Sequence, residues 1–287
     1  VIYFISRIKK NKHSNDNYQE YYSVSIIVSA YNEESNIRKK IENLFQLDYP
    51  KNKLEIIVAS DGSTDKTVSI VSEYKEVILL DYKENRGKAS INNDAANHSS
   101  GEILFFTDSE TILSKKFLKN ALKYFHNKNF GCGSGDYTFE SSEVFGESES
   151  FYWKNEKILR EAEHELGILP FASGGCMLIR KELYKSIQPY SDIDNVLPLH
   201  TLALGKKVFY AKSAKASDKS VTSEKQHLYK RIRTTQRSFT DMINFIPILI
   251  NKKLYIEVFI IFSHRFFRWS TGIFMFILFI SNLLLLF

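Results

Sequence analysis

Short apolar runs alternate with segments of helical periodicity in the first half of the chain, between about residues 22 and 130. Between the first two runs, Ile37, Ile41, Leu44 and Phe45 recur at helical spacing, and residues 87–99 form a further predicted helix. Strands that are almost continuously apolar and separated by helices indicate an α/β fold, with a mainly parallel sheet covered on both faces. Four runs predict such strands: VSIIVSA (24–30), LEIIVAS (54–60), VILLDY (77–82) and EILFFTD (102–108).

This alternation loosens after residue 130. The pattern there predicts a helix over 150–166, a turn and strand over 171–180 and a helix over 194–205. Residues 223–262 contain apolar runs that are too short to cross a bilayer and are interleaved with basic residues. This pattern is typical of amphipathic helices that lie in a membrane interface.

The end of the chain, residues 271–287, is an uncharged and largely apolar run of 17 residues. As a helix it would be about 26 Å long, which approaches the thickness of a bilayer core. The preceding HRFFRW (264–269) mixes arginine with aromatic residues, as membrane interfaces do. We therefore predict an α/β domain over 22–222, interfacial helices over 223–268 and a transmembrane helix over 269–287. The alternative for the last segment is a buried core helix.

The first residues, VIYFI, lead directly into Arg7, Lys9, Lys10 and Lys12. We interpret residues 1–12 as the end of an N-terminal membrane helix with its basic flank. Because positive flanks favour the cytoplasmic side, we expect a protein of the cell membrane whose α/β domain is cytoplasmic. The formal net charge is +6, but no nucleic-acid-binding motif accompanies it, so an anionic membrane surface is the expected partner. Two isolated cysteines indicate a reducing compartment.

Two carboxylates follow the fourth predicted strand, where Asp108 and Glu110 are one residue apart. Carboxylates beside an apolar core are costly unless a positive group meets them. Oxygen ligands of this kind suit Mg²⁺ or Mn²⁺, which take one or two protein carboxylates and keep positions for phosphate oxygens. Arg86 and Lys88 lie at the start of a predicted helix, a favourable place for a diphosphate. The pattern therefore predicts a metal that carries a nucleotide diphosphate.

Several ordered motifs resemble those of family-2 glycosyltransferases, which have the GT-A fold, a Rossmann-like mixed sheet. The resemblance covers about residues 22 to 240. It implies an inverting transfer from a nucleotide-diphosphate sugar, usually a UDP-sugar, to a glycan or lipid-linked acceptor. The motifs that carry it are VSIIVSAYNEESNI, IIVASDGSTDKT, NRGKASINNDA, ILFFTDSETIL, FASGGCMLIRKELY and DIDNVLPLHTLALGKKVFY.

The same resemblance implies roles for individual residues. Asp194 corresponds to the catalytic base, and Asp108 and Glu110 to the metal ligands. From the residues themselves, Gly174 and Gly175 would let an acceptor sugar approach the backbone, with a simple bend of the chain as the alternative. Arg231 and Arg233 would touch the diphosphate or acceptor, with a solvated or lipid-facing basic helix as the alternative. The nucleotide-sugar would be held by Ala30, Tyr31, Glu33, Asp61, Arg86, Lys88 and Asp108.

The sequence also departs from the family pattern. Ser60 replaces the first of two aspartates before Gly-Ser, and Asp192 is a rival to Asp194 for the base. The Gln-x-x-Arg-Trp motif of processive synthases is matched only by Lys230-Arg231-Ile232-Arg233-Thr234, so transfer of a single sugar is favoured. A processive polysaccharide synthase and a non-catalytic membrane scaffold with the same fold are the alternatives.

Overall fold

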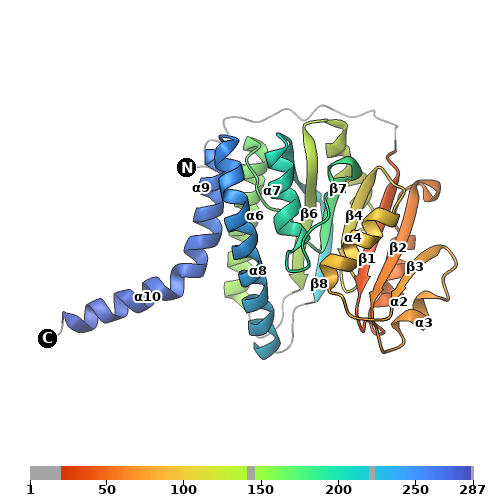
Figure 1. Cartoon of the computed structure of the whole chain (residues 1–287), viewed down its shortest axis with the longest axis horizontal. Helices are drawn as coiled ribbons and strands as arrows, with labels where there is room; N and C mark the ends of the chain where they lie inside the picture. Colours follow the sequence, from red (N-terminus) through yellow and green to blue (C-terminus); the bar gives the residue numbers. More distant parts are fainter. Residues whose placement is uncertain (1–20, 141–145, 220–223, 286–287) are drawn as a thin grey trace.

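The computed structural model of the 287-residue chain describes residues 21–140, 146–219 and 224–285 (Figure 1). An eight-stranded sheet is the centre of this part of the chain, with the strand order β3-β2-β1-β4-β7-β6-β8-β5. Its strands are β1 (Val24–Ala30), β2 (Leu54–Asp61), β3 (Val77–Tyr82), β4 (Ile103–Asp108), β5 (Ile112–Leu113), β6 (Phe130–Glu140), β7 (Cys176–Arg180) and β8 (Lys207–Lys219).

The first four strands are parallel, as the pattern of apolar runs predicts. β1 lies between β2 and β4, and β3 continues the sheet beyond β2. The direction reverses at β7, which is antiparallel to both β4 and β6, and β5 is antiparallel to β8. β8 and β6 are again parallel. The sheet is therefore mixed, and its parallel half carries most of the predicted site residues.

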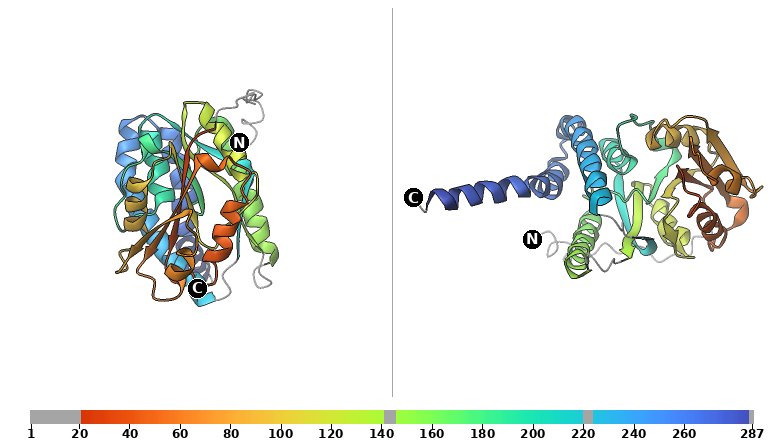
Figure 2. Two further views of the ribbon diagram at one scale, coloured as in Figure 1. Left: turned by 90° about the vertical axis from the view of Figure 1, so that its right-hand side faces the viewer. Right: turned by 90° about the horizontal axis from the view of Figure 1, so that it is seen from below.

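Helices cover both faces of the sheet (Figure 2). Along β1, Ile26 and Val28 face a core with α2 and α5, whereas Ile27 faces a second core with α4 and α7. This alternation follows from the two-residue period of a strand whose two faces are both buried. The helices of this part are α2 (Ile37–Phe45), α3 (Thr67–Val71), α4 (Lys88–His98), α5 (Phe117–Leu122), α6 (Gly146–Leu166) and α7 (Ile193–Ala203), with short 3₁₀ turns at η1 (Lys51–Lys53), η2 (Lys123–His126) and η3 (Lys181–Leu183).

The C-terminal part consists of α8 (Glu224–Asn251), α9 (Tyr255–Ile261), a π-helical turn η4 (Phe262–Phe266) and α10 (Phe267–Leu284). Met242 and Leu249 of α8 are buried in the core that contains α7, whereas α10 extends away from the body (Figure 1). Within the described residues, no single helix combines the length and apolarity needed to cross a bilayer. The segments Tyr255–Phe266 and Ser270–Leu284 meet this requirement only as a pair, bent by 61°. The transmembrane helix over 269–287 thus stays a prediction, and the segment 1–12 lies outside the described residues.

Candidate active site

The carboxyl ends of β1, β2 and β4 meet at one edge of the sheet. Ala30 pairs with Ser60, and Ser29 pairs with Asp108. Asp61 and Asp108 therefore lie at the same edge, as the sequence predicts, and this is where ligands bind in open α/β sheets. Ala30 is buried at the end of β1, whereas the following Tyr31 is half exposed.

Asp61 fixes the loop that leads into α4. Its two carboxylate oxygens accept hydrogen bonds from the backbone amides of Arg86, at 2.7 Å, and Gly87, at 2.9 Å. Gly87 has a φ of +87°, a conformation that glycine adopts without the steric cost of a side chain. The buried Asp61 thus determines where α4 begins and, with it, the position of Lys88.

Lys88, the first residue of α4, forms an ion pair with Asp108 at the end of β4. Burial alone would lower the pKa of Lys88, but the negative charges of Asp108, Asp194 and Asp192 outweigh it and raise this pKa. Lys88 is therefore the cation that faces both the end of β4 and the start of α7. The guanidinium of Arg86 is instead directed to Asp94, 2.9 Å away, and lies over the ring of Tyr82.

Carboxylates gather around the end of β4. Burial raises the pKa of Glu33, and the nearby charges of Asp108 and Asp218 raise it further. No three His, Cys, Asp or Glu side chains of the described ranges come together as a self-sufficient metal site. Mg²⁺ and Mn²⁺ that bind with phosphate need only one or two carboxylates, so Asp108 and Glu110 fit such an ion. The ammonium of Lys88 on Asp108 indicates that this position attracts positive charge.

Lys40 of α2 lies beside the turn between Asp108 and Glu110, and its side chain is fully buried. Its ammonium donates hydrogen bonds to Thr107 Oγ1 and to the carbonyl oxygen of Thr111, both at 2.7 Å. Burial lowers the pKa of Lys40 to about 7, although nearby Asp108 opposes this shift. Lys40 thus joins the two ends of the turn that carries the predicted metal ligands.

We expect Lys40→Ala to lower the free energy of unfolding by about 2–4 kcal/mol, because it leaves a cavity and two buried acceptors without their donor. Denaturant unfolding followed by circular dichroism measures this change. The neighbouring Lys39 is exposed and provides the matched control, since Lys39→Ala should change stability by less than about 0.5 kcal/mol. Equal effects of the two substitutions would contradict a structural role for Lys40.

Asp194 lies in the first turn of α7, and Asp192 is at the N-cap position of this helix but makes no side-chain capping hydrogen bond. Burial and the charge of Asp192 raise the pKa of Asp194 to about 6, whereas the charges of Arg265 and Lys88 lower it. Asp192 Oδ1 accepts a hydrogen bond from Arg237 of α8, at 3.0 Å. The ion pair engages Asp192, so Asp194 is the better candidate for a base.

The glycine pair before β7 forms the wall next to Asp194. A side-chain carbon added at Gly174 would come within 3.2 Å of Asp194 Cγ. A carbon added at Gly175 would lie only 2.5 Å from the ring of Tyr137, which is too close for any larger residue. The predicted acceptor residue Gly174 and the predicted base are therefore brought together, with little room for a side chain between them.

Residues 25–188, more than half of the chain, match the family model described as Glycosyl transferase family 2. The chain belongs to this family. Among curated relatives from Staphylococcus aureus, the poly(ribitol-phosphate) beta-N-acetylglucosaminyltransferase TarS of strain Mu50 is 33% identical over 104 residues, 35% of this chain and 18% of TarS. The poly-beta-1,6-N-acetyl-D-glucosamine synthase of strain COL is 30% identical over 134 residues, 45% of this chain and 32% of the synthase. The chain thus matches less than a third of the length of either relative.

Two solved structures share the fold of this family-2 chain. The mannosyltransferase PcManGT from Pyrobaculum calidifontis, in complex with GDP-Man and Mn²⁺, superposes with a TM-score of 0.71 and 23% identity, over 90% of this chain and 75% of PcManGT. S. aureus TarS 1–349, in complex with UDP-GlcNAc, gives a TM-score of 0.56 and 18% identity over 78% of this chain and 67% of TarS 1–349. These similarities show a GT-A-like α/β fold.

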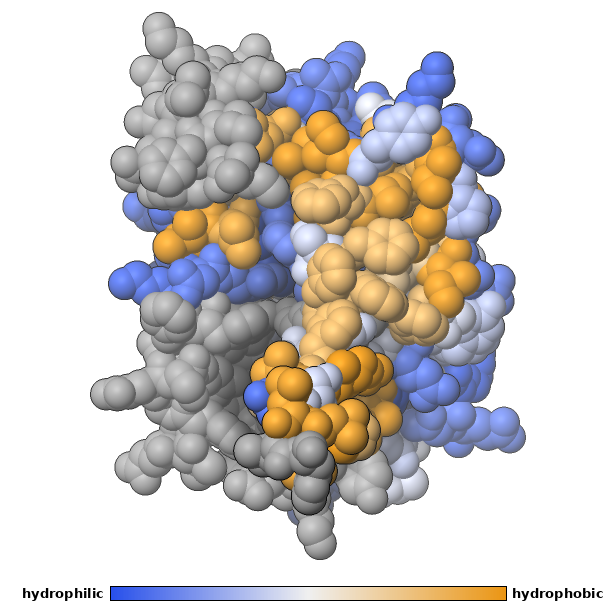
Figure 3. Space-filling model, turned by 90° about the vertical axis from the view of Figure 1, so that its left-hand side faces the viewer, coloured by the Kyte–Doolittle hydropathy of each residue, from blue (hydrophilic) through white to orange (hydrophobic). Residues whose placement is uncertain are grey.

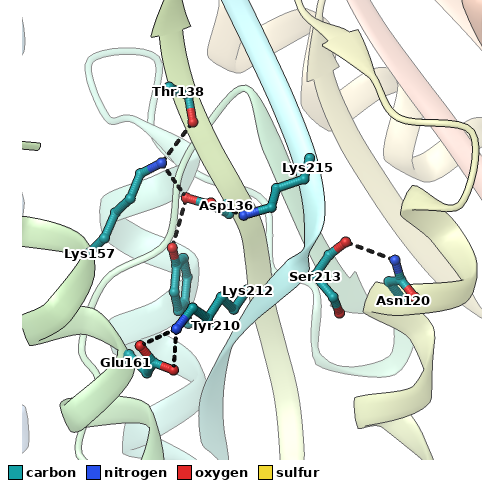
Figure 4. Close-up of polar contacts among 9 residues, drawn as sticks. All are labelled: Asn120, Asp136, Thr138, Lys157, Glu161, Tyr210, Lys212, Ser213 and Lys215. Carbon is teal, nitrogen blue, oxygen red and sulfur yellow. Dashed lines mark hydrogen bonds and ion pairs between the residues drawn. The ribbon is translucent and has the colours of Figure 1, made fainter. Parts of the chain in front are cut away.

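In this family-2 chain, α6 is attached to β6 through a buried carboxylate, Asp136 (Figure 4). Asp136 accepts hydrogen bonds from Tyr210 and Lys215 of β8, and its ion pair with Lys157 of α6 is 2.9 Å long. Burial opposes ionisation of Asp136, but these donors hold its pKa below the ordinary value. One turn after Lys157, Arg160 donates to Ser173 Oγ at 2.7 Å, directly before Gly174.

The remaining predicted site residues lie on α8. Arg233 is exposed, and the side chain of Arg231 lies outside the described part of the chain, so contact of either with a diphosphate stays a prediction. Lys40 and Arg265 are not among the residues predicted from the sequence. Lys40 could have been suspected because it shares the apolar face of α2 with Ile37, Ile41 and Leu44. No comparable signal points to Arg265.

Proposed function

We propose that this family-2 protein is a membrane-associated glycosyltransferase. It transfers a sugar, with inversion, from a nucleotide-diphosphate sugar to a glycan or lipid-linked acceptor at the cytoplasmic face of the membrane. The observation that carries the proposal is the Lys88–Asp108 ion pair together with the nearby Asp194, whose charge acts on Lys88. A group suited to bind diphosphate and a group suited to accept a proton therefore face each other. The nucleotide-sugars in the TarS and PcManGT complexes support this donor class.

On the donor side, Lys88 and the N-terminus of α4 present positive charge to a diphosphate. Asp108 and Glu110 would hold Mg²⁺ or Mn²⁺, which when bound supplies further positive charge to the diphosphate leaving group. Asp61 keeps Lys88 in place through the amides of Arg86 and Gly87. The nucleoside, uridine in our proposal, lies along the edge formed by the ends of β1 and β2, where Ala30, Tyr31 and Glu33 are found.

On the acceptor side, Asp194 removes the proton of the attacking hydroxyl. The hydroxyl oxygen forms a bond to the anomeric carbon as the bond from that carbon to the diphosphate oxygen breaks. Attack from the face opposite the diphosphate inverts the configuration, and the proton remains on Asp194. A pKa of about 6 leaves this carboxylate ionised, yet basic enough to take a proton, near neutral pH. Gly174 keeps the approach to Asp194 free of a side chain.

The membrane association rests on the C-terminal helices. Figure 3 shows apolar side chains gathered on the side of the molecule from which α10 extends. Exposed apolar surface of this extent marks an interaction surface, and the basic residues at 230–237 suit anionic lipids. The exposed apolar side chains include Ile243, Ile250, Ile256, Phe259, Ile273, Phe276 and Leu278.

The proposal is tested by titrating the detergent-solubilised full chain with UDP and GDP, with and without Mn²⁺, in a calorimeter. We expect metal-dependent binding of one nucleotide, followed by release of that nucleotide from UDP-GlcNAc or GDP-Man when acceptor is added. Absence of binding under all conditions would contradict the proposal and favour the scaffold alternative. A ladder of products rather than one added sugar would favour the processive alternative.

A further inference from the structure

Arg265 lies on the π-helical turn η4, between α9 and α10, far from the motifs of the catalytic edge in the sequence. Within the described part of the chain, Ser238 and Phe171 both contact its guanidinium. The group donates a hydrogen bond to Ser238 Oγ of α8, at 3.2 Å, and lies over the ring of Phe171 with 4.3 Å between Cζ and the ring centroid. Phe171 belongs to the segment that leads to Gly174, so Arg265 is held against the wall of the candidate site.

The same serine connects Arg265 to α7. Asn195, the residue after the proposed base Asp194, donates to Ser238 Oγ at 2.8 Å. Arg265 and Asn195 therefore share one hydroxyl between α7 and the C-terminal helices. Both line a small cleft there, together with Phe171, Leu199, Ser238, Met242 and Ile261.

We propose that Arg265 is a positioning residue for Asp194: its guanidinium, fixed by Ser238 and Phe171, keeps the carboxylate of the first turn of α7 charged and ready to accept a proton. The inference rests on the proposed function, because it assigns Arg265 a role through the base of that reaction. It also gives the C-terminal segment a part in the active site. The turn that supplies Arg265 continues directly into α10, the predicted membrane helix.

The charges around Asp194 come from several elements. Asp192, directly before α7, raises the pKa of Asp194, whereas Arg265 of η4 and Lys88 of α4 lower it. Arg237 of α8 is paired with Asp192, and Lys88 is paired with Asp108. Arg265 is thus a cation of the C-terminal turn that acts on Asp194 and is held beside α7 through Ser238, so its loss should raise the pKa of Asp194.

The neighbouring residue of the turn η4, His264, contacts α6. His264 Nδ1 lies 3.1 Å from Glu163 Oε1, a buried carboxyl group of α6. Burial raises the pKa of Glu163 to about 8, and the nearby charge of Glu156 contributes to this rise. Because α6 also holds Ser173 through Arg160, the turn with Arg265 and the wall with Gly174 are attached to one helix.

The test compares Arg265→Gln and Arg265→Lys in the full chain in detergent. Carbon-13 NMR of aspartate-labelled protein, with the Asp194 signal assigned from Asp194→Asn, measures the pKa directly and needs no substrate. We expect Arg265→Gln to raise this pKa by about one unit and Arg265→Lys to change it little. The acidic limb of the transfer rate should move to higher pH by the same amount, with the donor KM unchanged within about twofold. Lys252→Gln removes an exposed cation directly after α8 and is the control. It should change neither the pKa of Asp194 nor the pH of the acidic limb.

The measurements on these variants can contradict either the role of Arg265 or the proposed base. An unchanged pKa of Asp194 in Arg265→Gln, in a protein that still binds nucleotide and melts normally, would overturn the inference. A rate loss that is equal at every pH would do the same, because it would indicate a packing role. If Asp194→Asn retained full transfer activity, the proposed base itself would be wrong, whatever the NMR titration of Arg265→Gln showed. The failure of the inference and that of the proposed function are thus distinguishable.

Discussion

Asp194→Asn should reduce the transfer rate by about 10²–10⁴-fold, the usual contribution of a general base, and leave nucleotide binding nearly unchanged. The asparagine side chain keeps the shape of aspartate in the first turn of α7 but cannot take up the proton of the acceptor hydroxyl. In the unsubstituted protein the rate should fall as the pH drops through about 6, because protonation of Asp194 at its pKa of about 6 removes the base. Release of the nucleotide from the donor, measured against pH, gives both results.

Asp192→Asn is the matched comparison, since it removes a carboxylate two residues away. Asp192 is paired with Arg237, so its loss should weaken the attachment of α7 to α8 and lower the rate by no more than about tenfold. It should also lower the pKa of Asp194, because the charge of Asp192 raises that value. If Asp192→Asn were inactive while Asp194→Asn remained active, the assignment of the two residues would have to be exchanged.

The parallel half of the fold could be predicted from sequence because its strands are buried on both faces. Such strands are continuous apolar runs bounded by polar residues, and the observed β1 and β3 have the predicted limits. The reversal at β7 could not be predicted in this way. An apolar run such as CMLIR shows that a strand is buried, but it carries no information about the direction of the strand beside it.

Some residues of the candidate site could likewise be predicted from the sequence, and others could not. Asp61, Lys88 and Asp108 could be brought together from sequence because parallel strands end at one edge of a sheet. Lys40 could not, because its role depends on Thr111, which is 71 residues away in the sequence. The choice between Asp192 and Asp194 also needed a distant contact, the ion pair of Asp192 with Arg237.

The composition of HRFFRW explains why Arg265 was missed. Arginine beside aromatic residues is typical of a membrane interface, so the sequence of this segment predicts an interfacial role. In the structure the same arginine reaches Ser238 and Phe171, next to α7. One segment can both lie at a membrane interface and contact the region of α7, since the two sides of a helical turn face different surroundings.

Asp108→Asn should abolish the metal dependence of nucleotide binding. A neutral amide oxygen replaces one of the two carboxylates proposed to hold Mg²⁺ or Mn²⁺, Asp108 and Glu110. Loss of a residue that only supports a metal ligand commonly costs about 10–100-fold in metal affinity, and loss of the ligand itself should cost at least as much. Calorimetric titration with UDP, with and without Mn²⁺, should therefore give the same weak affinity under both conditions.

The ion pair with Lys88 makes this prediction specific. When Asp108 is replaced, Lys88 loses its ion-pair partner. The pKa of Lys88 should then fall, because the charge of Asp108 is the largest of the effects that raise it. The freed ammonium would remain beside the diphosphate, so metal-independent binding should persist or increase slightly while the response to Mn²⁺ disappears. Asp48→Asn is the matched control, because Asp48 forms an exposed ion pair with Lys119 on the surface and should leave the Mn²⁺ response intact. A normal Mn²⁺ response in Asp108→Asn would mean that Asp108 does not hold the metal, and it would contradict this assignment.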